Sequence, residues 1–439
     1  MKKQLLCTSA IALGVAAAPA AAQDWNLDWG GFFNTHVAVG DISTNLTALG
    51  APGGTLPGTV GGQSWDGDGV DVFTNPEIIF SPSVTLDNGM TFGINIQMEG
   101  TTSGGPNIDE SYASMSSDTF GRLDVGNENS AGYKLMTAAP EVTSLGINSP
   151  STSAFIPFTG VDAAISAGMR LNAPGLGNAF TASLTALPFR QASLSAFTEV
   201  GGNNDVSRIT YYTPDFNGLT VGLSYAPTAA INAGNSFSIN RNAVISDVFD
   251  IGVNYSNTFG STDITLSARW GTGDTPSVAA GASDPETWGV GFQVGFGNFT
   301  VGGSYTENDN DETLIGRAIA APTVGGAAIP GATGAPAGTI GFGDSEGWSL
   351  GVTYDTAGPW SFEAVTYQSE TDLVNAGAVI PGAKTDRELY RIGASRTLGP
   401  GVDWDIYVIH ETRDATLLGI LPGDEVEGTL LGTAINLSF

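Results

Sequence analysis

The sequence predicts an all-β protein, a closed antiparallel β-barrel that crosses a membrane. Three observations lead to this prediction. Apolar side chains alternate with small or polar ones along many segments, which is the period-two pattern of strands with one apolar face. The connections between these segments are alternately short and long, as in membrane barrels with tight turns at one end and loops at the other. The chain also begins with a sequence typical of an export signal.

The end of the chain, residues 425–439, shows the alternation clearly. One face carries Thr429, Leu431, Thr433, Ile435, Leu437 and Phe439, whereas the other carries only small or polar residues and Leu430. A strand with a free edge is an aggregation hazard, so a terminal strand needs a partner on both sides. Closing the sheet supplies this partner, and we expect 425–439 to pair with the first strand, 25–39.

The first half of the chain contains strands separated by tight turns and by longer loops. Asp87, Asn88 and Gly89 form a sequence typical of tight hairpin turns. A glycine-rich loop, 40–69, and a long irregular stretch from Asn127 interrupt the pattern. The strands predicted in this half are 25–39, 70–86, 90–98, 108–117 and 120–126.

The second half repeats the pattern, with turns that contain glycine, proline or asparagine. We place these turns at 214–218, 259–260, 297–298, 358–359 and 399–401. They join predicted strands in pairs, 209–211 with 219–225, 249–255 with 264–270, 288–296 with 299–305, 348–354 with 360–362, and 390–398 with 404–408.

Residues 1–22 are predicted to be a secretory signal peptide, which leaves 23–439 to form the barrel. Lys2 and Lys3 precede a mostly apolar stretch, and the alanines at 20–22 provide a small-residue cleavage site. The only cysteine, Cys7, would leave with the signal, so no disulfide is expected. Loss of the two lysines changes the formal net charge from −29 to −31. Such an acidic chain lacks the basic face that nucleic-acid binding requires.

Alternation alone does not distinguish a membrane barrel from a soluble sandwich that buries its apolar face. The opposite parity is rich in Gly, Ser, Thr, Asn, Asp and Arg, which a membrane barrel turns toward its lumen. The signal, the strand lengths and the lack of cysteine favour the membrane barrel, whose sheet must close because lipid offers no hydrogen bonds. Aromatic residues cluster at strand ends, as an interfacial girdle requires: Trp270, Trp288, Tyr305, Trp348, Tyr354 and Trp360.

Several stretches resemble the general porins of Gram-negative outer membranes, in particular the alphaproteobacterial, Rhodobacter-type branch. Residues 120–126, Phe-Gly-Arg-Leu-Asp-Val-Gly, resemble the family's strand before its constriction loop. Residues 208–218, Arg-Ile-Thr-Tyr-Tyr-Thr-Pro-Asp-Phe-Asn-Gly, resemble the strand and turn after that loop, and 224–227, Ser-Tyr-Ala-Pro, close the next strand. The terminal Phe439 resembles the family's signal to the barrel assembly machinery.

The resemblance implies a barrel of about 16 strands, a homotrimer, and a long third loop folded into the lumen. A direct count of alternating segments gives about 18 strands, because 162–187 also has the pattern of a hairpin around a turn at 173–175. We expect about 16 and keep about 18 as the alternative.

The residues of polar parity include the candidates for a pore constriction. Five arginines would face the lumen: Arg122, Arg208, Arg269, Arg387 and Arg391. Three acids of the long loop are the candidate opposing groups: Glu128, Glu141 and Asp162. Opposite charges across a narrow zone orient polar solutes and disfavour apolar ones. Further acids in the external loops, Glu307 among them, predict weak cation selectivity because a negative mouth concentrates cations.

Few residues suggest any other chemistry. Residues 343–347, Gly-Asp-Ser-Glu-Gly, match a nucleophile elbow, but that motif needs a preceding strand and a following helix, and here a strand follows. His36 and His410 have no second ligand at metal or catalytic-triad spacing. The acidic run 307–312 lacks the spaced ligands of a calcium loop. We therefore expect no enzymatic activity, no catalytic residue, no metal site and no cofactor.

The sequence thus predicts an outer-membrane porin for passive diffusion of small hydrophilic solutes and ions. The expected partners are outer-membrane lipid and lipopolysaccharide, the barrel assembly machinery and further copies of the chain. A substrate-specific channel is one alternative, and saturable block by one solute would identify it. A secreted soluble β-rich binding protein, such as a lectin, is the alternative from another class, and solubility without detergent would identify it.

Overall fold

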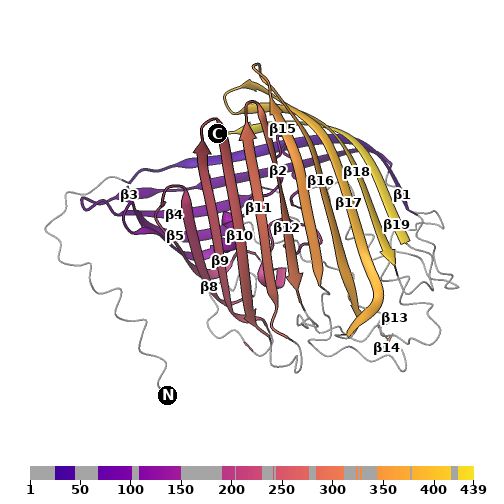
Figure 1. Ribbon diagram of the computed structural model, residues 1–439, viewed down its shortest axis with the longest axis horizontal. Helices are drawn as coiled ribbons and strands as arrows, with labels where there is room; N and C mark the ends of the chain where they lie inside the picture. The colour runs from indigo at the N-terminus through magenta and orange to yellow at the C-terminus, as the bar shows by residue number, and fades with distance from the viewer. Residues whose placement is uncertain are drawn as a thin grey trace.

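A computed structural model shows an antiparallel barrel in which the strands of the near and far walls cross at a steep angle (Figure 1). The structure describes residues 25–44, 68–100, 108–149, 190–202, 204–229, 241, 244–275, 283–310, 323–324, 327–328, 344–375, 378–416 and 424–439.

The barrel strands follow one another around the wall in chain order. They are β1 (Trp29–Thr44), β2 (Gly69–Phe80), β3 (Ser83–Thr85), β4 (Thr91–Glu99), β5 (Ile108–Ser117), β6 (Gly121–Glu128), β7 (Val206–Tyr212), β8 (Leu219–Thr228), β9 (Ser246–Phe259), β10 (Thr262–Asp274), β11 (Glu286–Phe296), β12 (Phe299–Asp309), β15 (Ser345–Asp355), β16 (Trp360–Asn375), β17 (Ala378–Gly399), β18 (Val402–Thr416) and β19 (Asp424–Ser438). The remaining strands, β13 (Thr323–Val324) and β14 (Ala327–Ala328), form a separate hairpin.

The sheet closes between its first and last strands, as predicted. β19 pairs with β1 from Phe32 opposite Ser438 to Thr44 opposite Val426. β2 and β3 both pair with β4, and Pro82 between them has no backbone N–H to donate, so the two segments form one interrupted strand. Counted in this way, the 17 strand segments of the sheet make a closed barrel of 16 strands.

The alternative of about 18 strands is wrong. β6 pairs directly with β7, from Arg122 opposite Tyr212 to Glu128 opposite Val206. The ring therefore has no place for an additional hairpin between these strands. The predicted hairpin at 162–187 and the predicted signal peptide, 1–22, lie outside the described residues.

The tight turns lie where the sequence places them. Gly260, Gly297 and Gly401 have positive φ angles of 68°, 60° and 66°, in the left-handed region that glycine adopts without strain. The opposite end of the barrel carries the longer connections, which identifies it as the external end. Within the described residues the helices are α1 (Ala131–Leu135) and the 3₁₀ turn η3 (Val200–Gly202), and neither is long and apolar enough to cross a membrane.

The outer surface of the barrel is apolar and exposed, as the alternation predicts. Leu223, Leu266, Val290, Leu350 and Val408 all point outward near the middle of their strands. Aromatic rings meet at strand ends, for example Phe299 and Tyr354, with centroids 4.7 Å apart. This arrangement fits a lipid-facing band with interfacial aromatic residues.

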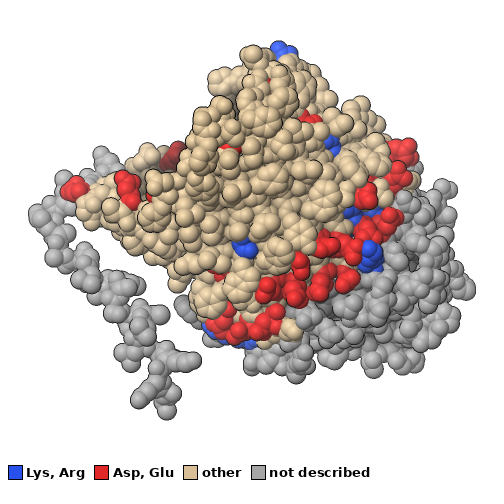
Figure 2. All heavy atoms as spheres, in the orientation of Figure 1, with Lys and Arg blue, Asp and Glu red and all other residues tan. Residues whose placement is uncertain are grey.

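A row of carboxylates borders the apolar band at the external end (Figure 2). Glu307, Glu346, Glu370 and Asp386 are direct partners across four adjacent strands. The hydroxyl of Tyr305, on the outer face, donates to Glu346 Oε2 at 2.6 Å and to Glu307 Oε2 at 3.3 Å. The expectation that Glu307 lies in a loop at the pore mouth is wrong, because its strand parity places it on the outer surface.

Candidate functional site

The connection from β6 to β7 runs inside the barrel. Its first part, 129–149, is the outbound arm and contains α1, and its last part, 190–202, is the return arm and ends in η3. The two arms are joined where Ala196 N–H donates to the carbonyl of Asn148 at 2.9 Å. The long loop expected in the lumen is therefore present, and its described ends lie against the inner wall.

Side chains of the wall accept hydrogen bonds from the backbone of the outbound arm, strand after strand. The acceptors are Ser224 for Ala131 N–H, Asp250 for Gly132, Ser267 for Thr137, Ser349 for Ala139, Glu363 for Val142 and Asp405 for Ser144. These acceptors belong to β8, β9, β10, β15, β16 and β18. The arm is thus fixed along more than half of the circumference by bonds that depend on the wall residues.

The return arm is fixed mainly through its carbonyl groups. The hydroxyl of Tyr367 donates to the carbonyl of Ala192 at 2.6 Å, and that of Ser369 donates to Ser193 at 2.7 Å. Arg387 Nη1 donates to the carbonyl of Leu194 at 3.3 Å.

An apolar core lies inside the barrel beneath the arms. Leu145, Ile147 and Ala196 of the arms are completely buried. The inner face of β16–β18 supplies the buried side chains Tyr367, Leu389, Tyr407 and Ile409. The inner-face parity, expected to be rich in Gly, Ser, Thr, Asn, Asp and Arg, thus also carries large buried apolar and aromatic side chains on these strands.

Four of the five candidate arginines are buried beneath the arms. Arg391 ion-pairs with Glu141 Oε2 and Glu363 Oε1, each at 2.6 Å, and donates to the carbonyl of Leu145. Arg387 Nε lies 2.5 Å from Glu411 Oε1.

The other two buried arginines meet the return arm from the opposite side. Arg269 pairs with Asp250 and donates to the carbonyl of Thr198. Arg208 Nη2 lies 3.9 Å from Glu199 Oε1. Each of the four arginines thus connects the wall to the loop.

Arg122, the fifth candidate, has a different environment. Its side chain is 45% exposed to the lumen, although Nε pairs with Asp124 at 2.8 Å. Its Nη2 donates to the hydroxyl of Tyr112 at 3.1 Å, and Lys134 lies over the same ring, 4.6 Å from the centroid. Lys134, in α1, is held against this part of the wall by ion pairs with Glu128, 2.8 Å away, and with Glu110, 3.3 Å away.

The candidate acids, like the arginines, have different surroundings. Glu141 meets Arg391, as opposing charges should, and also accepts from Ile147 N–H. Glu128 is buried and pairs with Lys134 instead of a candidate arginine. Asp162 lies outside the described residues. Lys134, Glu363 and Glu199 were not predicted as site residues, because strand parity or a position in the loop does not by itself indicate an ion-pair partner.

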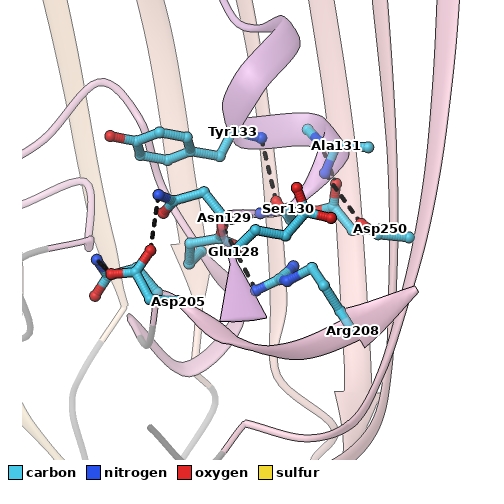
Figure 3. Close-up of polar contacts among 12 residues, drawn as sticks. Glu128, Asn129, Ser130, Ala131, Tyr133, Asp205, Arg208 and Asp250 are labelled. Carbon is cyan, nitrogen blue, oxygen red and sulfur yellow. Dashed lines mark hydrogen bonds and ion pairs between the residues drawn. The ribbon is translucent and has the colours of Figure 1, made fainter. Parts of the chain in front are cut away.

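Both ends of the loop meet at a neck, where Asn129 lies beside Asp205 (Figure 3). Ser130 caps α1, and its own N–H donates to Glu199 Oε1 at 2.7 Å. Asn129 Nδ2 donates to Glu110 Oε1 and to Asp205 Oδ1, both at 2.9 Å. Burial, followed by the negative charges of Asp109 and Glu110, raises the pKa of Asp205 to about 8.

The predicted assembly residue lies at the point of closure. Phe439 exchanges two backbone hydrogen bonds with Gly31 of β1, both at 3.2 Å, and its side chain is exposed on the outer surface. In the described part of the chain, no group of three or more His, Cys, Asp or Glu residues is arranged to hold a metal ion.

Comparisons with known proteins agree with this architecture. The model of the family described as Gram-negative porin matches residues 8–416. An anion-selective porin from Comamonas acidovorans is 14% identical with a TM-score of 0.53, over 95% of this chain and all of that one (100%). The outer membrane channel DcaP of Acinetobacter baumannii is 13% identical with a TM-score of 0.54, over 94% and 97%.

OmpT, an outer membrane protein of Vibrio cholerae in its trimer form, is 10% identical with a TM-score of 0.51, over 94% of this chain and 99% of that one. At these identities the structural likenesses show the fold alone. No curated protein sequence matches the chain. The family match covers most of the chain, and the protein belongs to the Gram-negative porin family.

Proposed function

We propose that this protein is an outer-membrane porin through which small hydrophilic solutes and ions diffuse passively. The observation that carries this function is the inner wall of the closed barrel. The loop is held against one part of the wall, while side chains such as Asn95, Gln97 and Arg122 on another part keep access to water. A water-filled path through an apolar-surfaced barrel is what diffusion across the outer membrane requires.

Conductance in planar lipid bilayers tests this function. Purified, detergent-solubilised protein should insert in steps, and the step size should rise in proportion to the conductivity of the bulk salt solution. Folded protein that inserts without conductance would contradict the proposal. Saturable block by a single sugar or anion would instead identify a substrate-specific channel.

We also propose the features that the family match leaves open. The protein is exported with a cleaved signal peptide, 1–22, comes from the alphaproteobacterial branch and acts as a channel and not as an enzyme. It lies in the outer membrane as a homotrimer among lipid and lipopolysaccharide, and the trimer form of the Vibrio cholerae relative supports this state. Native mass spectrometry in detergent gives the number of copies, and the N-terminal sequence of the mature protein gives the cleavage site.

The terminal residue is proposed to be read by the barrel assembly machinery. The exposed side chain and the backbone pairing of Phe439 with Gly31 support this role, since the residue completes the closing seam. Phe439→Ala should lower the amount of heat-modifiable barrel in the outer membrane with little effect on export. Unchanged levels would remove Phe439 from this role.

We propose that the predicted constriction residues divide into two roles. Arg208, Arg269, Arg387 and Arg391 act as clamps that hold the loop, with Glu141 as the loop partner of Arg391. Arg122 acts in the water-filled path, and Glu128 positions Lys134 beside it. Asp162 stays a candidate for the constriction.

A further inference from the structure

The inner wall of the barrel consists of two unlike halves. The covered half is the inner face of the barrel strands from β7 to β19, and the open half is the inner face of β2–β6. β1 lies between them, carries the buried inner-face residues His36 and Ala38, and is assigned to neither. Every strand of the covered half has at least one inner-face residue that is no more than 5% exposed: Arg208, Ser224, Asp250, Arg269, Thr287, Thr306, Ser349, Glu363, Arg391, Asp405 and Ala434. In the open half Glu110 of β5 and Asp124 and Glu128 of β6 are equally buried, so burial alone does not separate the two. What distinguishes the covered half is that each of its strands from β7 to β18 has an inner-face side chain bonded directly to a loop arm.

The open half keeps contact with water. On β2, β4, β5 and β6 the following inner-face residues are half-buried or exposed: Asp71, Phe73, Asn75, Asn95, Gln97, Glu99, Ser114, Ser116 and Arg122. They extend from the external ends of these strands to the turn between β5 and β6. This face thus provides a hydrated strip along the barrel.

We infer that permeating ions pass along the inner face of β2–β6, and that Glu99, Asp109 and Arg122 on this face, not the buried arginines, set the charge selectivity. This inference rests on the proposed function and names the residues that would control it. It assigns the path to the open half and the clamping of the loop to the covered half.

The charges of the open half favour cations. Glu77 on β2 is the direct partner of Glu99 on β4, although like charges opposite one another destabilise a sheet. Asp109 adds a half-buried carboxylate on the neighbouring strand β5. The ionisable groups of this face are Asp71, Glu77, Glu99, Asp109, Glu110, Asp124, Glu128 and Arg122, together with Tyr112 and with Lys134 from α1. Carboxylates outnumber cations here, and a negative wall raises the local concentration of cations.

The buried arginines contribute little to the field in the path. Arg391 and Arg387 are neutralised by carboxylates within 2.6 Å, and Arg269 by the neighbouring Asp250. An ion pair presents a dipole and not a net charge, so its field decreases faster with distance than that of a single group such as Glu99. The selectivity should therefore follow the less completely neutralised charges of the open half.

The zero-current potential across a salt gradient tests the assignment of charge. One charge about 8 Å from the ion path, with a screening length of about 10 Å, changes the ratio of cation to anion permeability about twofold. Glu99→Gln should lower the ratio by this factor, and Arg122→Gln should raise it. Glu307→Gln removes the same charge from the outer surface and should leave the ratio unchanged. An unchanged ratio in Glu99→Gln, or an equal change in Glu307→Gln, would overturn the inference.

Thiol accessibility tests the path without replacing any charged residue. Ser114→Cys on β5 and Ser304→Cys on β12 make the same small change on the inner face of the open and covered halves. A positively charged methanethiosulfonate reagent, which the negative wall attracts and which adds bulk and positive charge to the path, should reduce the conductance of the Ser114 variant and leave the Ser304 variant and wild type unaffected. Equal block of both variants, or block of the Ser304 variant alone, would contradict the path.

These measurements distinguish a failure of the proposed function from a failure of the inferred ion path. If wild-type protein does not conduct, the proposed function fails. If it conducts and the open-half variants behave like the outer-surface and covered-half controls, only the path and its selectivity residues fail.

Discussion

The two halves of the inner wall have similar outer surfaces but different tasks. The covered half uses serines, acids and arginines to bind the loop backbone, and it adds apolar residues such as Leu389 and Ile409 that are completely buried. In the open half, polar groups bond mainly to one another or to the neck, as Gln97 does to Asn95 and Glu110. The difference shows that a polar inner face can be a docking surface for the protein's own chain as well as the wall of a pore.

Arginine illustrates the difference most directly. Arg391 and Arg122 occupy the same parity and were equal candidates for a constriction. The first is a buried clamp with two carboxylate partners, and the second is a half-exposed group with one. Removing one partner from a buried ion pair strongly lowers the free energy of unfolding because the other charge remains buried and unpaired. An exposed pair contributes little to stability.

Replacement of these arginines should give the largest difference in stability between the two halves. Arg391→Met should lower the free energy of unfolding by about 3–5 kcal/mol, because Glu141 and Glu363 lose their buried counter-charge. Arg122→Met, the matched change in the open half, should cost about 0–1 kcal/mol. Urea unfolding in lipid vesicles, followed by tryptophan fluorescence, measures both. Equal costs would mean that Arg391 does not act as a clamp.

The lipid-facing surface should not distinguish the halves. Leu350 on β15 and Ile94 on β4 both point outward near the middle of their strands. An arginine at either position should cost about 2–4 kcal/mol, since a charge near the bilayer midplane is unfavourable on any strand. The same unfolding measurement applies. A cost near zero for Ile94→Arg alone would indicate that this part of the wall does not face lipid.

The strands, the turns and the closing seam could be predicted from the sequence because they depend on local patterns. The alternation of apolar and polar residues predicts that Leu350 lies on the outer surface, and the glycine at 297 predicts a turn with a positive φ angle. The path of the loop could not be predicted in this way. Arg391 and Glu141 are 250 positions apart, and Arg391 has the same strand parity as Arg122. Parity indicates which side of the wall a residue takes, but not whether water or the loop lies there.

The apolar inner face of β16–β18 has the same explanation. The residues at 389 and 409 are Leu and Ile on the inner-face parity, which is mainly polar. In sequence they resemble irregularities of the alternation, but in the barrel they are direct cross-strand partners of the buried Tyr367 and Leu430, and Leu145 and Ile147 of the loop are buried as well. A break in the expected polar parity was therefore the available signal for a covered wall.

Removal of a single tyrosine hydroxyl should give a smaller difference in stability between the two halves. Tyr367 is completely buried and donates to the carbonyl of Ala192, whereas Tyr112 in the open half accepts from the half-exposed Arg122. Tyr367→Phe should cost about 1–3 kcal/mol because the carbonyl stays buried without its partner. Tyr112→Phe should cost less, since water can reach Arg122. A larger cost for Tyr112→Phe would contradict the division into covered and open halves.

The smallest expected effect concerns the neck, where the two halves meet. Asp205 has a pKa of about 8, raised by burial and by Asp109 and Glu110, so the folded protein retains a proton that the unfolded chain releases near pH 4. Between these values the native state binds more protons than the unfolded state, and this group therefore makes stability fall as pH rises toward 8. Asp205→Asn keeps the polar side chain and tolerates the positive φ of 53° at this position, but it cannot ionise. Unfolding free energies measured between about pH 5 and 8 should decline less steeply in the variant, by at most about 1.4 kcal/mol per pH unit, the limit for one proton. Parallel pH profiles for variant and wild type would show that Asp205 is already ionised in the folded neck.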